Sequence, residues 1–189
     1  MPRVREIDLT TLPEPLRERL AAQQQALGGE ATWQKVMAHR PKQLGHLLDL
    51  MACFSDEERI PRRLRELIVV TVSKANACDH CVGRHSVRLN KTGLPHATID
   101  ALLEPDCPGL SVQETLVRDY ALAVTRDSRR LRDATFDRLR AHFDDTQIVE
   151  ITLLITLAGF FNAFNNAMQV ELDAGHAAML AEQRTDEQT

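Results

Sequence analysis

Two cysteines and a histidine stand close together near the middle of the chain, at Cys78, Cys81 and His85. On a helix, spacings of three and four residues place their side chains on one face. Two thiols on one face can approach disulfide geometry, and an imidazole one turn away can act as a base. Because thiolates attack peroxides and disulfides, the spacing favours redox chemistry. A metal site and a buried structural cysteine pair are the alternatives at this point.

The element that carries these residues is expected to be a helix that begins just before Cys78. Asn76 can serve as its N-cap, and Asp79 would lie in the first turn, where a carboxylate complements the helix dipole. The free N–H groups at a helix N-terminus stabilise a thiolate and lower the pKa of the thiol. The sequence therefore predicts a redox-active dithiol in the first two turns of a helix.

Three other interpretations compete with the dithiol. A zinc site needs a fourth ligand, such as Glu66 or Cys53, and structural zinc sites typically combine two CxxC clusters, whereas this chain has one. A thioredoxin-like site needs a βαβ setting, and no segment shows the alternation typical of a strand. A buried structural pair rarely needs an imidazole above a thiol, so His85 argues against it. Cys53 is otherwise expected to be buried at the apolar end of a helix.

The two thiols differ in what would activate them. Cys81 lies one turn from His85, whereas Cys78 lies nearer the helix N-terminus, where the attacking thiol of thioredoxin-like sites is found. We take Cys81 as the attacking thiol because it has the nearer base. On one unbroken helix Glu66 would lie about 120° from Cys78. A proton relay through Glu66 therefore requires a break near residues 75–77, which would put Glu66 on a neighbouring helix.

The composition is that of a soluble globular domain. The 189 residues are 43% apolar and 26% charged, with a net charge of −4 and no long basic block, so nucleic-acid and membrane-surface partners are not expected. The first residues lack the apolar core of a secretory signal, and we expect a cytoplasmic location. Residues 151–170 carry no charge, but Asn162, Asn165 and Asn166 would be costly in a bilayer. We expect a buried core helix that also meets another subunit.

Helical periodicity dominates the chain and predicts an all-α fold. Ser111 and Glu114 have the spacing of a capping box. Helices are expected at about 41–51, 61–71, 76–92, 111–124, 135–143 and 145–172. We expect a single domain over 1–189, with an N-terminal helical extension at 1–40, a core at 41–172, and a C-terminal helix and tail at 173–189.

A faint internal repeat occurs at an offset of 84 residues. It aligns Glu66 with Glu150 and the two cysteines of the CxxC pair with Asn162 and Asn165. We interpret the repeat as an internal duplication of a helical hairpin, in which the second copy holds an inert polar version of the site. Chance similarity between apolar helices is the alternative.

The motif as a whole resembles a known family. Glu66, followed by Cys78, His80, Cys81 and His85, fits the pattern E-x11-C-x-H-C-x3-H of the alkylhydroperoxidase AhpD. The neighbouring residues are similar to the wider AhpD-like/carboxymuconolactone decarboxylase superfamily, over about residues 40–172. The resemblance implies an AhpD-like helical fold, assembled as a homo-oligomer such as a trimer or hexamer. It also implies a thiol-dependent peroxidase that uses neither metal nor another cofactor.

The resemblance also implies a role for each residue of the motif. Cys81 would be the peroxidatic cysteine and Cys78 its resolving partner. Glu66 and His85 would form a proton relay through a water, with His80 in support. The substrate would be a hydroperoxide, and an external dithiol or thiol protein would be the reductant. Because the decarboxylase branch generally works without the two cysteines, their presence favours the redox branch.

Two further functions stay open on the sequence. One is a carboxymuconolactone decarboxylase-like lyase acting on a small carboxylated lactone, with Glu66 and His85 as acid and base. The other is a non-catalytic oligomer that senses redox state through Cys78 and Cys81.

Overall fold

The structure, a computed structural model, describes residues 1–27, 31–56 and 59–187, and within these residues every regular element is a helix. The expected all-α class is therefore confirmed. The α-helices are α1 (Glu14–Leu27), α2 (Thr32–Met37), α3 (Pro41–Asp56), α4 (Arg62–Ala75), α5 (Asp79–Asn90), α6 (His96–Asp100), α7 (Val112–Asp127), α8 (Asp133–Arg140), α9 (Asp145–Met168) and α10 (Ala174–Asp186). Short 3-10 helices are η1 (Leu9–Thr11), η2 (Ala101–Leu103) and η3 (Ser128–Arg130).

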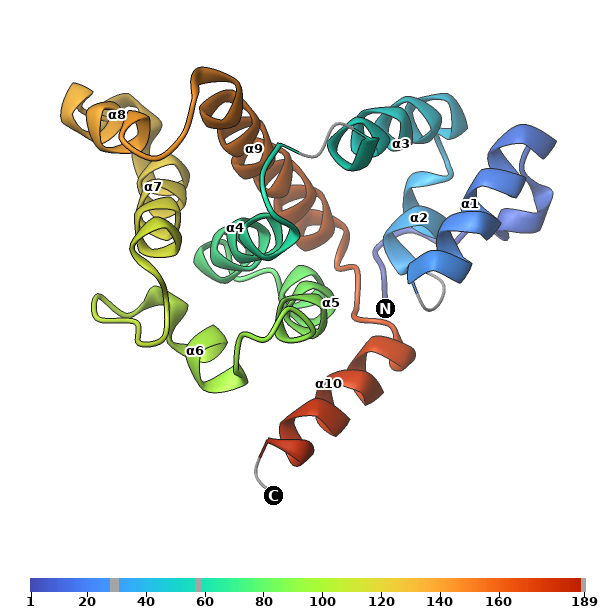
Figure 1. Cartoon of the computed structure of the whole chain (residues 1–189). Helices are drawn as coiled ribbons and strands as arrows, with labels where there is room; N and C mark the ends of the chain where they lie inside the picture. Colours follow the sequence, from blue (N-terminus) through green and yellow to red (C-terminus); the bar gives the residue numbers. More distant parts are fainter. Residues whose placement is uncertain (28–30, 57–58, 188–189) are drawn as a thin grey trace.

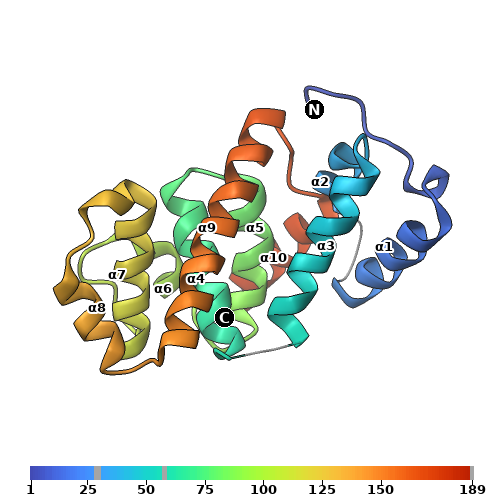
Figure 2. The same ribbon diagram turned by 90° about the horizontal axis from the view of Figure 1, so that it is seen from above.

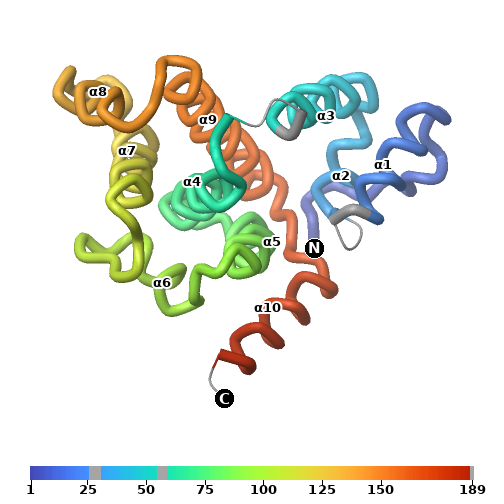
Figure 3. The backbone as a smooth tube through the Cα atoms, viewed as in Figure 1, coloured from blue at the N-terminus to red at the C-terminus, as the bar shows by residue number. Residues whose placement is uncertain are grey.

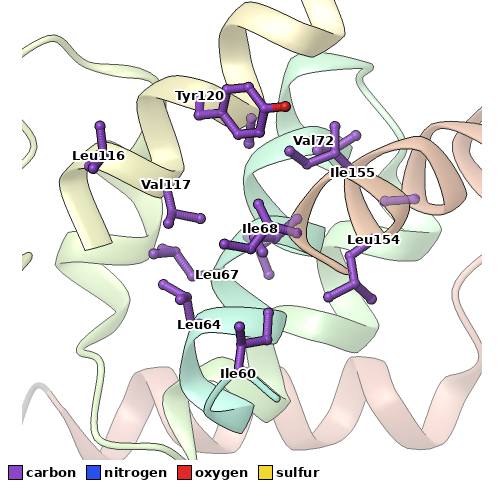
Figure 4. Packing of buried hydrophobic residues seen from close by; sticks show 14 of the residues in the cluster. Ile60, Leu64, Leu67, Ile68, Val72, Leu116, Val117, Tyr120, Leu154 and Ile155 are labelled. Carbon is purple, nitrogen blue, oxygen red and sulfur yellow. The ribbon is translucent and has the colours of Figure 1, made fainter. Parts of the chain in front are cut away.

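Helix α4 is the centre of the main hydrophobic core. It packs against α5, α7 and α9, and Figure 1 shows it surrounded by these three helices. Its apolar residues Leu64, Leu67 and Ile68 are buried because they recur at helical spacing on its inward faces. Figure 4 shows them meeting side chains of α7, such as Val117, and of α9, such as Ile155. This core fixes α4 relative to α5 and α9, the helices that carry the reactive residues.

A second hydrophobic core lies in the N-terminal part of the chain. It joins η1, α1, α2 and α3, with Trp33, Leu44 and Leu48 among its buried members. Phe161 and Phe164 of α9 pack against this core. Viewed from above in Figure 2, α1 lies at one end of the molecule and α7 and α8 at the other. Helix α9 is thus shared by both cores and links the two ends.

The chain breaks between α4 and α5, as the proposed relay required. Helix α4 ends at Ala75, Ala77 takes a left-handed conformation with φ of 49°, and α5 begins at Asp79. The predicted cap is wrong in detail: Asn76 is the C-cap of α4, and Cys78 is the N-cap of α5. The break turns the chain so that α5 packs back along α4.

The internal duplication is not seen as a second hairpin. Residues 145–168, which span most of the second copy, form the one uninterrupted helix α9, because no break like that at Ala77 occurs until Gln169, with φ of 52°. Asp144 and Gln147 form a capping box at its start, which sets where it begins.

Helix α9 is long and apolar enough by length and composition to cross a membrane, alone among the helices of the described residues. However, Ile151, Leu154 and Ile155 are buried against the main core, as expected of a core helix. Its other face leaves Val149, Leu153 and Phe160 about half exposed.

The two ends of the chain pack near the site-bearing helices. In Figure 3 the C-terminal helix α10 passes beside α5, which it contacts along its length. The backbone N–H of Arg3 donates to the carbonyl of Met168, so the N-terminal segment is tied to the end of α9. Arg84 of α5 forms an ion pair with Asp173, just before α10, and this buried contact fixes the start of α10.

Candidate active site

A cavity of about 580 Å³ opens between the two hydrophobic cores. Four of the five residues singled out from the sequence line it, namely Glu66, His80, Cys81 and His85, and Cys78 does not. Helices α2, α3 and α9 supply the apolar part of the wall: Trp33, Met51, Phe54, Leu154, Leu157, Ala158 and Phe161. The structure therefore brings the predicted residues together at the polar end of one cavity.

Glu66 and His85 form a close pair from two different helices. Nδ1 of His85 on α5 lies 2.7 Å from Oε2 of Glu66 on α4, so the expected contact across the break is present. Burial works against the charged form of Glu66, but the charge and hydrogen bond of His85 outweigh it and hold the pKa of that carboxyl below its usual range. Glu66 therefore fixes Nδ1 of the ring as the hydrogen-bond donor and leaves Nε2 for other work.

Cys81 is held as the acidic thiol of the pair. Its Sγ accepts a hydrogen bond from Nδ2 of Asn165 on α9, at 3.2 Å. The Cys78 thiol also hydrogen-bonds to it, and this is the largest influence on its pKa; burial opposes, while Asn165 and the charge of His85 assist. Together these contacts lower the pKa of Cys81 to about 6. Near neutral pH Cys81 is a thiolate at the wall of the cavity.

Cys78 lies behind Cys81 and is fully buried. Its hydrogen bond to Cys81 raises the pKa of the Cys78 thiol, and burial raises it further, because the proton is shared with an adjacent thiolate. Both cysteines are free thiols in the structure. As N-cap of α5, Cys78 cannot reach the cavity, whereas Cys81, three residues on, lies in the first turn and faces it. Of the two thiols, Cys81 is thus the one that borders the cavity.

No hydrogen bond joins the His85 ring to Cys81 in the part of the chain that the structure describes. The imidazole acts on the thiol through its charge, which lowers the pKa of Cys81. A proton passing between the two would need a bridging water, and the relay through a water stays a prediction.

His80 is a buried base of fixed tautomer. Its Nδ1 lies 2.9 Å from the carbonyl oxygen of Glu171, to which it donates. Its Nε2 is buried without a hydrogen-bond partner among the described residues. Burial lowers the pKa of His80 to about 4, so the ring is neutral near pH 7. The unpartnered nitrogen is then a hydrogen-bond acceptor at the cavity wall.

Two asparagines of α9 complete the site, and the sequence analysis misjudged them as inert. Asn165 donates to Cys81, while Nδ2 of Asn162 donates to Oγ of Ser73 and its Oδ1 accepts from Asn76, each at 3.0 Å. These bonds tie α9 to the end of α4 directly beside the cysteines. The signal in the sequence was two buried amides three residues apart on an otherwise apolar helix, which need buried partners.

The other cysteines lie away from the cavity. Cys53 is exposed on α3, where its thiol donates to the carbonyl of Asp49, so the prediction that it is buried is wrong. It faces away because Leu48 and Met51 occupy the inward side of that helix. A zinc site with Cys53 as fourth ligand is not formed, and Glu66 is engaged by His85.

Comparison with known proteins finds one family model that matches the middle of the chain. Residues 47–127 match the sequence model of the carboxymuconolactone decarboxylase family. The uncharacterized protein YdfG of Bacillus subtilis is 29% identical over 120 residues, which cover 62% of this chain and 82% of YdfG. YnjA of Escherichia coli, also uncharacterized, is 27% identical over 128 residues, 66% of this chain and 70% of YnjA.

Solved structures share the fold over nearly the whole chain. An uncharacterized peroxidase-related protein from Ralstonia eutropha JMP134, described as an alkylhydroperoxidase AhpD core, superposes with a TM-score of 0.84 at 24% identity, covering 93% of this chain and 94% of that one. The debrominase Bmp8, solved with 2,3,4-tribromopyrrole, gives a TM-score of 0.78 at 22% identity, covering 96% and 97%. The chain is therefore similar to the carboxymuconolactone decarboxylase family over residues 47–127, and it shares the AhpD-like helical fold over most of its length.

Proposed function

We propose that the protein is a thiol-dependent peroxidase that reduces hydroperoxides through a Cys78/Cys81 dithiol–disulfide cycle. The observation that carries the proposal is the state of Cys81, a thiol with a pKa of about 6 at the cavity wall, hydrogen-bonded to a second thiol behind it. Only a thiolate attacks peroxides at a useful rate, and a neighbouring thiol is what resolves the product.

The first half of the cycle consumes the peroxide. The Cys81 thiolate attacks the outer oxygen of the hydroperoxide, an S–O bond forms, and the O–O bond breaks. The electron pair leaves with the alkoxide, which takes a proton from His85 and departs as the alcohol. Cys81 is now a sulfenic acid. Glu66, 2.7 Å from Nδ1 of His85, stabilises the imidazolium before that transfer.

The second half restores the thiols. The Cys78 thiol attacks the sulfenic acid, an S–S bond forms, and water leaves. An external dithiol or thiol protein then reduces the disulfide and is itself oxidised. The sum is one hydroperoxide and one dithiol converted to an alcohol, water and an external disulfide. The cycle draws its electrons from thiols and calls on no metal or organic cofactor.

The unpartnered Nε2 of His80 suits a supporting role. A neutral acceptor at the cavity wall can take the hydrogen bond of the hydroperoxide O–H and orient its outer oxygen toward Cys81. The expected homo-oligomer, a trimer or hexamer, stays a prediction. The half-exposed apolar residues Val149, Leu153 and Phe160 of α9 support it, because another copy could cover them.

The test is peroxide-dependent oxidation of a small dithiol, with sulfenic acid trapping as a second readout. Cys81→Ser should lower turnover to the rate of the dithiol and peroxide alone. Cys78→Ser should also stop turnover but leave a trappable sulfenic acid at Cys81. The matched control is Cys53→Ser, which removes an exposed thiol outside the cavity and should behave as the wild type. Sulfenic acid at Cys78 in the Cys81→Ser protein would reverse the two assignments.

A second candidate is a lyase acting on a small carboxylated lactone. The Glu66–His85 pair favours it, since acid and base lie within hydrogen-bond reach independently of the cysteines. Counting free thiols before and after peroxide separates the two, because a lyase that retains all its thiols and turns over without Cys78 and Cys81 would displace the peroxidase. Oxidation of the pair without dithiol turnover would instead indicate the redox sensor.

A further inference from the structure

We propose that the cavity selects an organic hydroperoxide that carries a carboxylate, with Arg88 binding that carboxylate while the peroxide lies against Cys81. The proposal rests on the peroxidase function above and adds the class of substrate. Its basis is a positively charged end of the cavity that the peroxidase cycle does not use.

Arg88 lies on the same face of α5 as the reactive residues. It follows His85 by three residues and Cys81 by seven, which is two helix turns, and it lines the same cavity. Seven residues of helix rise by about 10 Å, so the backbones that carry the cation and the thiolate are two turns apart along the cavity wall. A ligand that touches both must carry two functional groups separated by a spacer.

The guanidinium of Arg88 has no hydrogen bond or ion pair within the described ranges of the chain, although it is partly buried. Burial lowers the pKa of Arg88, and the charges of Arg84 and Arg62 lower it further, while the charges of Glu66 and, more weakly, Asp173 oppose them. Glu66, however, already bonds to His85. Asp173 likewise pairs with Arg84 and His176. A partly buried cation whose acidic neighbours are engaged elsewhere is a site for an anion.

The excess of positive charge belongs to this cavity and not to the protein as a whole. Among the residues whose side chains the structure describes, four arginines, Arg62, Arg65, Arg84 and Arg88, line it beside one acid, Glu66, whereas the chain carries a net charge of −4. Two of the four are engaged in other contacts: Arg84 forms an ion pair with Asp173, and Arg65 donates to the carbonyl of Phe54. Arg62 and Arg88 therefore set the local potential, which attracts an anionic substrate and raises its local concentration.

The wall that α2, α3 and α9 supply is apolar and suits a hydrocarbon spacer. Trp33, Met51, Phe54 and Phe161 face the cavity, and Trp33 meets Phe161 edge to face with ring centroids 5.0 Å apart. The volume of about 580 Å³ is that of a site for a small organic molecule. Hydrogen peroxide would leave both the apolar wall and Arg88 unused, whereas an alkyl or aryl hydroperoxide with a carboxylate contacts all three parts.

The chemistry is that of the cycle already described, with the carboxylate unchanged throughout. The thiolate takes the outer oxygen, the O–O bond breaks, and the alkoxide leaves with a proton as a hydroxy acid. The Cys78 thiol releases water as the disulfide forms, and the external dithiol is oxidised as it restores the thiols. Arg88 thus binds substrate without entering the proton or electron transfer.

The first experiment measures binding and needs no turnover. Trp33 is the single tryptophan of the chain and lines the cavity, so its fluorescence reports occupancy. The probes are 4-isopropylbenzoate and its methyl ester, which share one hydrocarbon body and differ in charge. In the wild type we expect the acid to bind about tenfold more tightly than the ester, the contribution of one charge-assisted contact. Equal affinity of acid and ester would overturn the proposal without any variant.

The variants assign the contact to Arg88. Arg88→Gln should bring the affinities of acid and ester together, and Arg88→Lys, which keeps the charge but loses the planar fork, should fall between. The matched control is Arg138→Gln, which removes an exposed arginine of α8 outside the cavity and should keep the wild-type ratio. A preference for the acid that survives Arg88→Gln would show that the carboxylate binds elsewhere.

The second experiment measures turnover of the matching hydroperoxides, cumene hydroperoxide with a para carboxylate and the methyl ester of that acid. We expect kcat/KM to favour the acid about tenfold in the wild type and equally for both in Arg88→Gln. Charge-selective binding without turnover of either peroxide would leave the anion site standing and reject the peroxidase. Turnover that ignores the carboxylate would keep the peroxidase and reject the anion site.

Discussion

At the scale of single residues, the reactivity of the site depends on what surrounds one sulfur atom. Cys78 and Cys81 are three residues apart on one chain, yet their pKa values move in opposite directions. Sequence spacing predicted the dithiol and its base, and it favoured Cys81 only through the nearer histidine. The hydrogen bond from Cys78, the donor from Asn165 and the place of Cys81 at the cavity wall favour the same thiol, and the last two come from helix packing.

Replacing Asn165 by Leu should raise the pKa of Cys81 from about 6 by about one unit or more. The substitution removes a donor to the thiolate, and hydrogen bonds to charged groups contribute about 1.5–3 kcal/mol, against about 1.4 kcal/mol per pKa unit. The measurement is the pH dependence of iodoacetamide alkylation of Cys81. Asn166→Leu is the control, because Asn166 donates to the carbonyl of Asn76 and not to a thiol. If the pH midpoint of Cys81 alkylation is the same in Asn165→Leu as in the wild type, the hydrogen bond from Asn165 does not lower the pKa of Cys81.

At the scale of elements, the turn between α4 and α5 makes the site possible. Without it Glu66 would lie on another face of one long helix, and its 2.7 Å contact with His85 could not form. The sequence required a break near residues 75–77, and the structure places a left-handed residue at Ala77. The identity of the cap was not predictable, because Asn76 can cap either the end of one helix or the start of the next.

Replacing Ala77 by glycine should change the free energy of unfolding little, whereas the same replacement in the middle of a helix should lower it. At φ of 49° an L-residue is strained by about 1–2 kcal/mol, so Ala77→Gly relieves strain that offsets the entropy cost of glycine. Ala77→Val, with a branched Cβ, should lower the free energy of unfolding by more than about 1 kcal/mol. Urea denaturation measures both.

The reference for that prediction is Ala123→Gly, in the interior of α7, which should lower the free energy of unfolding by about 0.5–1 kcal/mol. If glycine is as destabilising at 77 as at 123, the left-handed turn is not the conformation of the protein in solution.

At the scale of the whole molecule, the site lies in the cavity between the two hydrophobic cores. The main core positions α4, α5 and α9 with the residues of the motif, and the N-terminal core brings Trp33 and Met51 to the opposite wall. The motif occupies residues 66–85, whereas the apolar wall of the cavity is formed by residues of helices as distant in the sequence as α2 and α9. Such distant partners leave no local pattern in a sequence, which is why the cavity could not be predicted.

The ionisation of Cys81 should make the stability of the whole protein depend on pH. Its pKa is about 6 in the folded protein against an ordinary value of 9.0, so between these values the unfolded chain binds a proton that the folded chain has lost. The stabilisation is complete above pH 9 and is lost as the pH falls toward 6. The free energy of unfolding of the wild type, relative to Cys81→Ser, should rise over this range by on the order of 1 kcal/mol per pH unit.

Urea denaturation of both proteins under reducing conditions, at pH 6 and at pH 9, measures that difference. A difference that stays flat between the two would mean that folding does not favour the thiolate. A loss of stability at acid pH that wild type and variant share would come from other groups, such as His80. The pKa of His80 is about 4 in the folded protein against an ordinary value of 6.5, so its contribution to stability is complete above pH 6.5 and is lost as the pH falls toward 4.

The sequence by itself determined the helical class, the break that Glu66 needs, and the set Cys78, Cys81 and His85, because helical periodicity and short spacings are local properties. Only the tertiary structure decided which thiol faces the cavity, that Asn165 stabilises it, and that Arg88 stands at the far end with no partner among the described residues. Those facts depend on how α9 and the N-terminal helices pack against α5. Packing of that kind is a sum over contacts between distant segments, and no single stretch of the chain contains it.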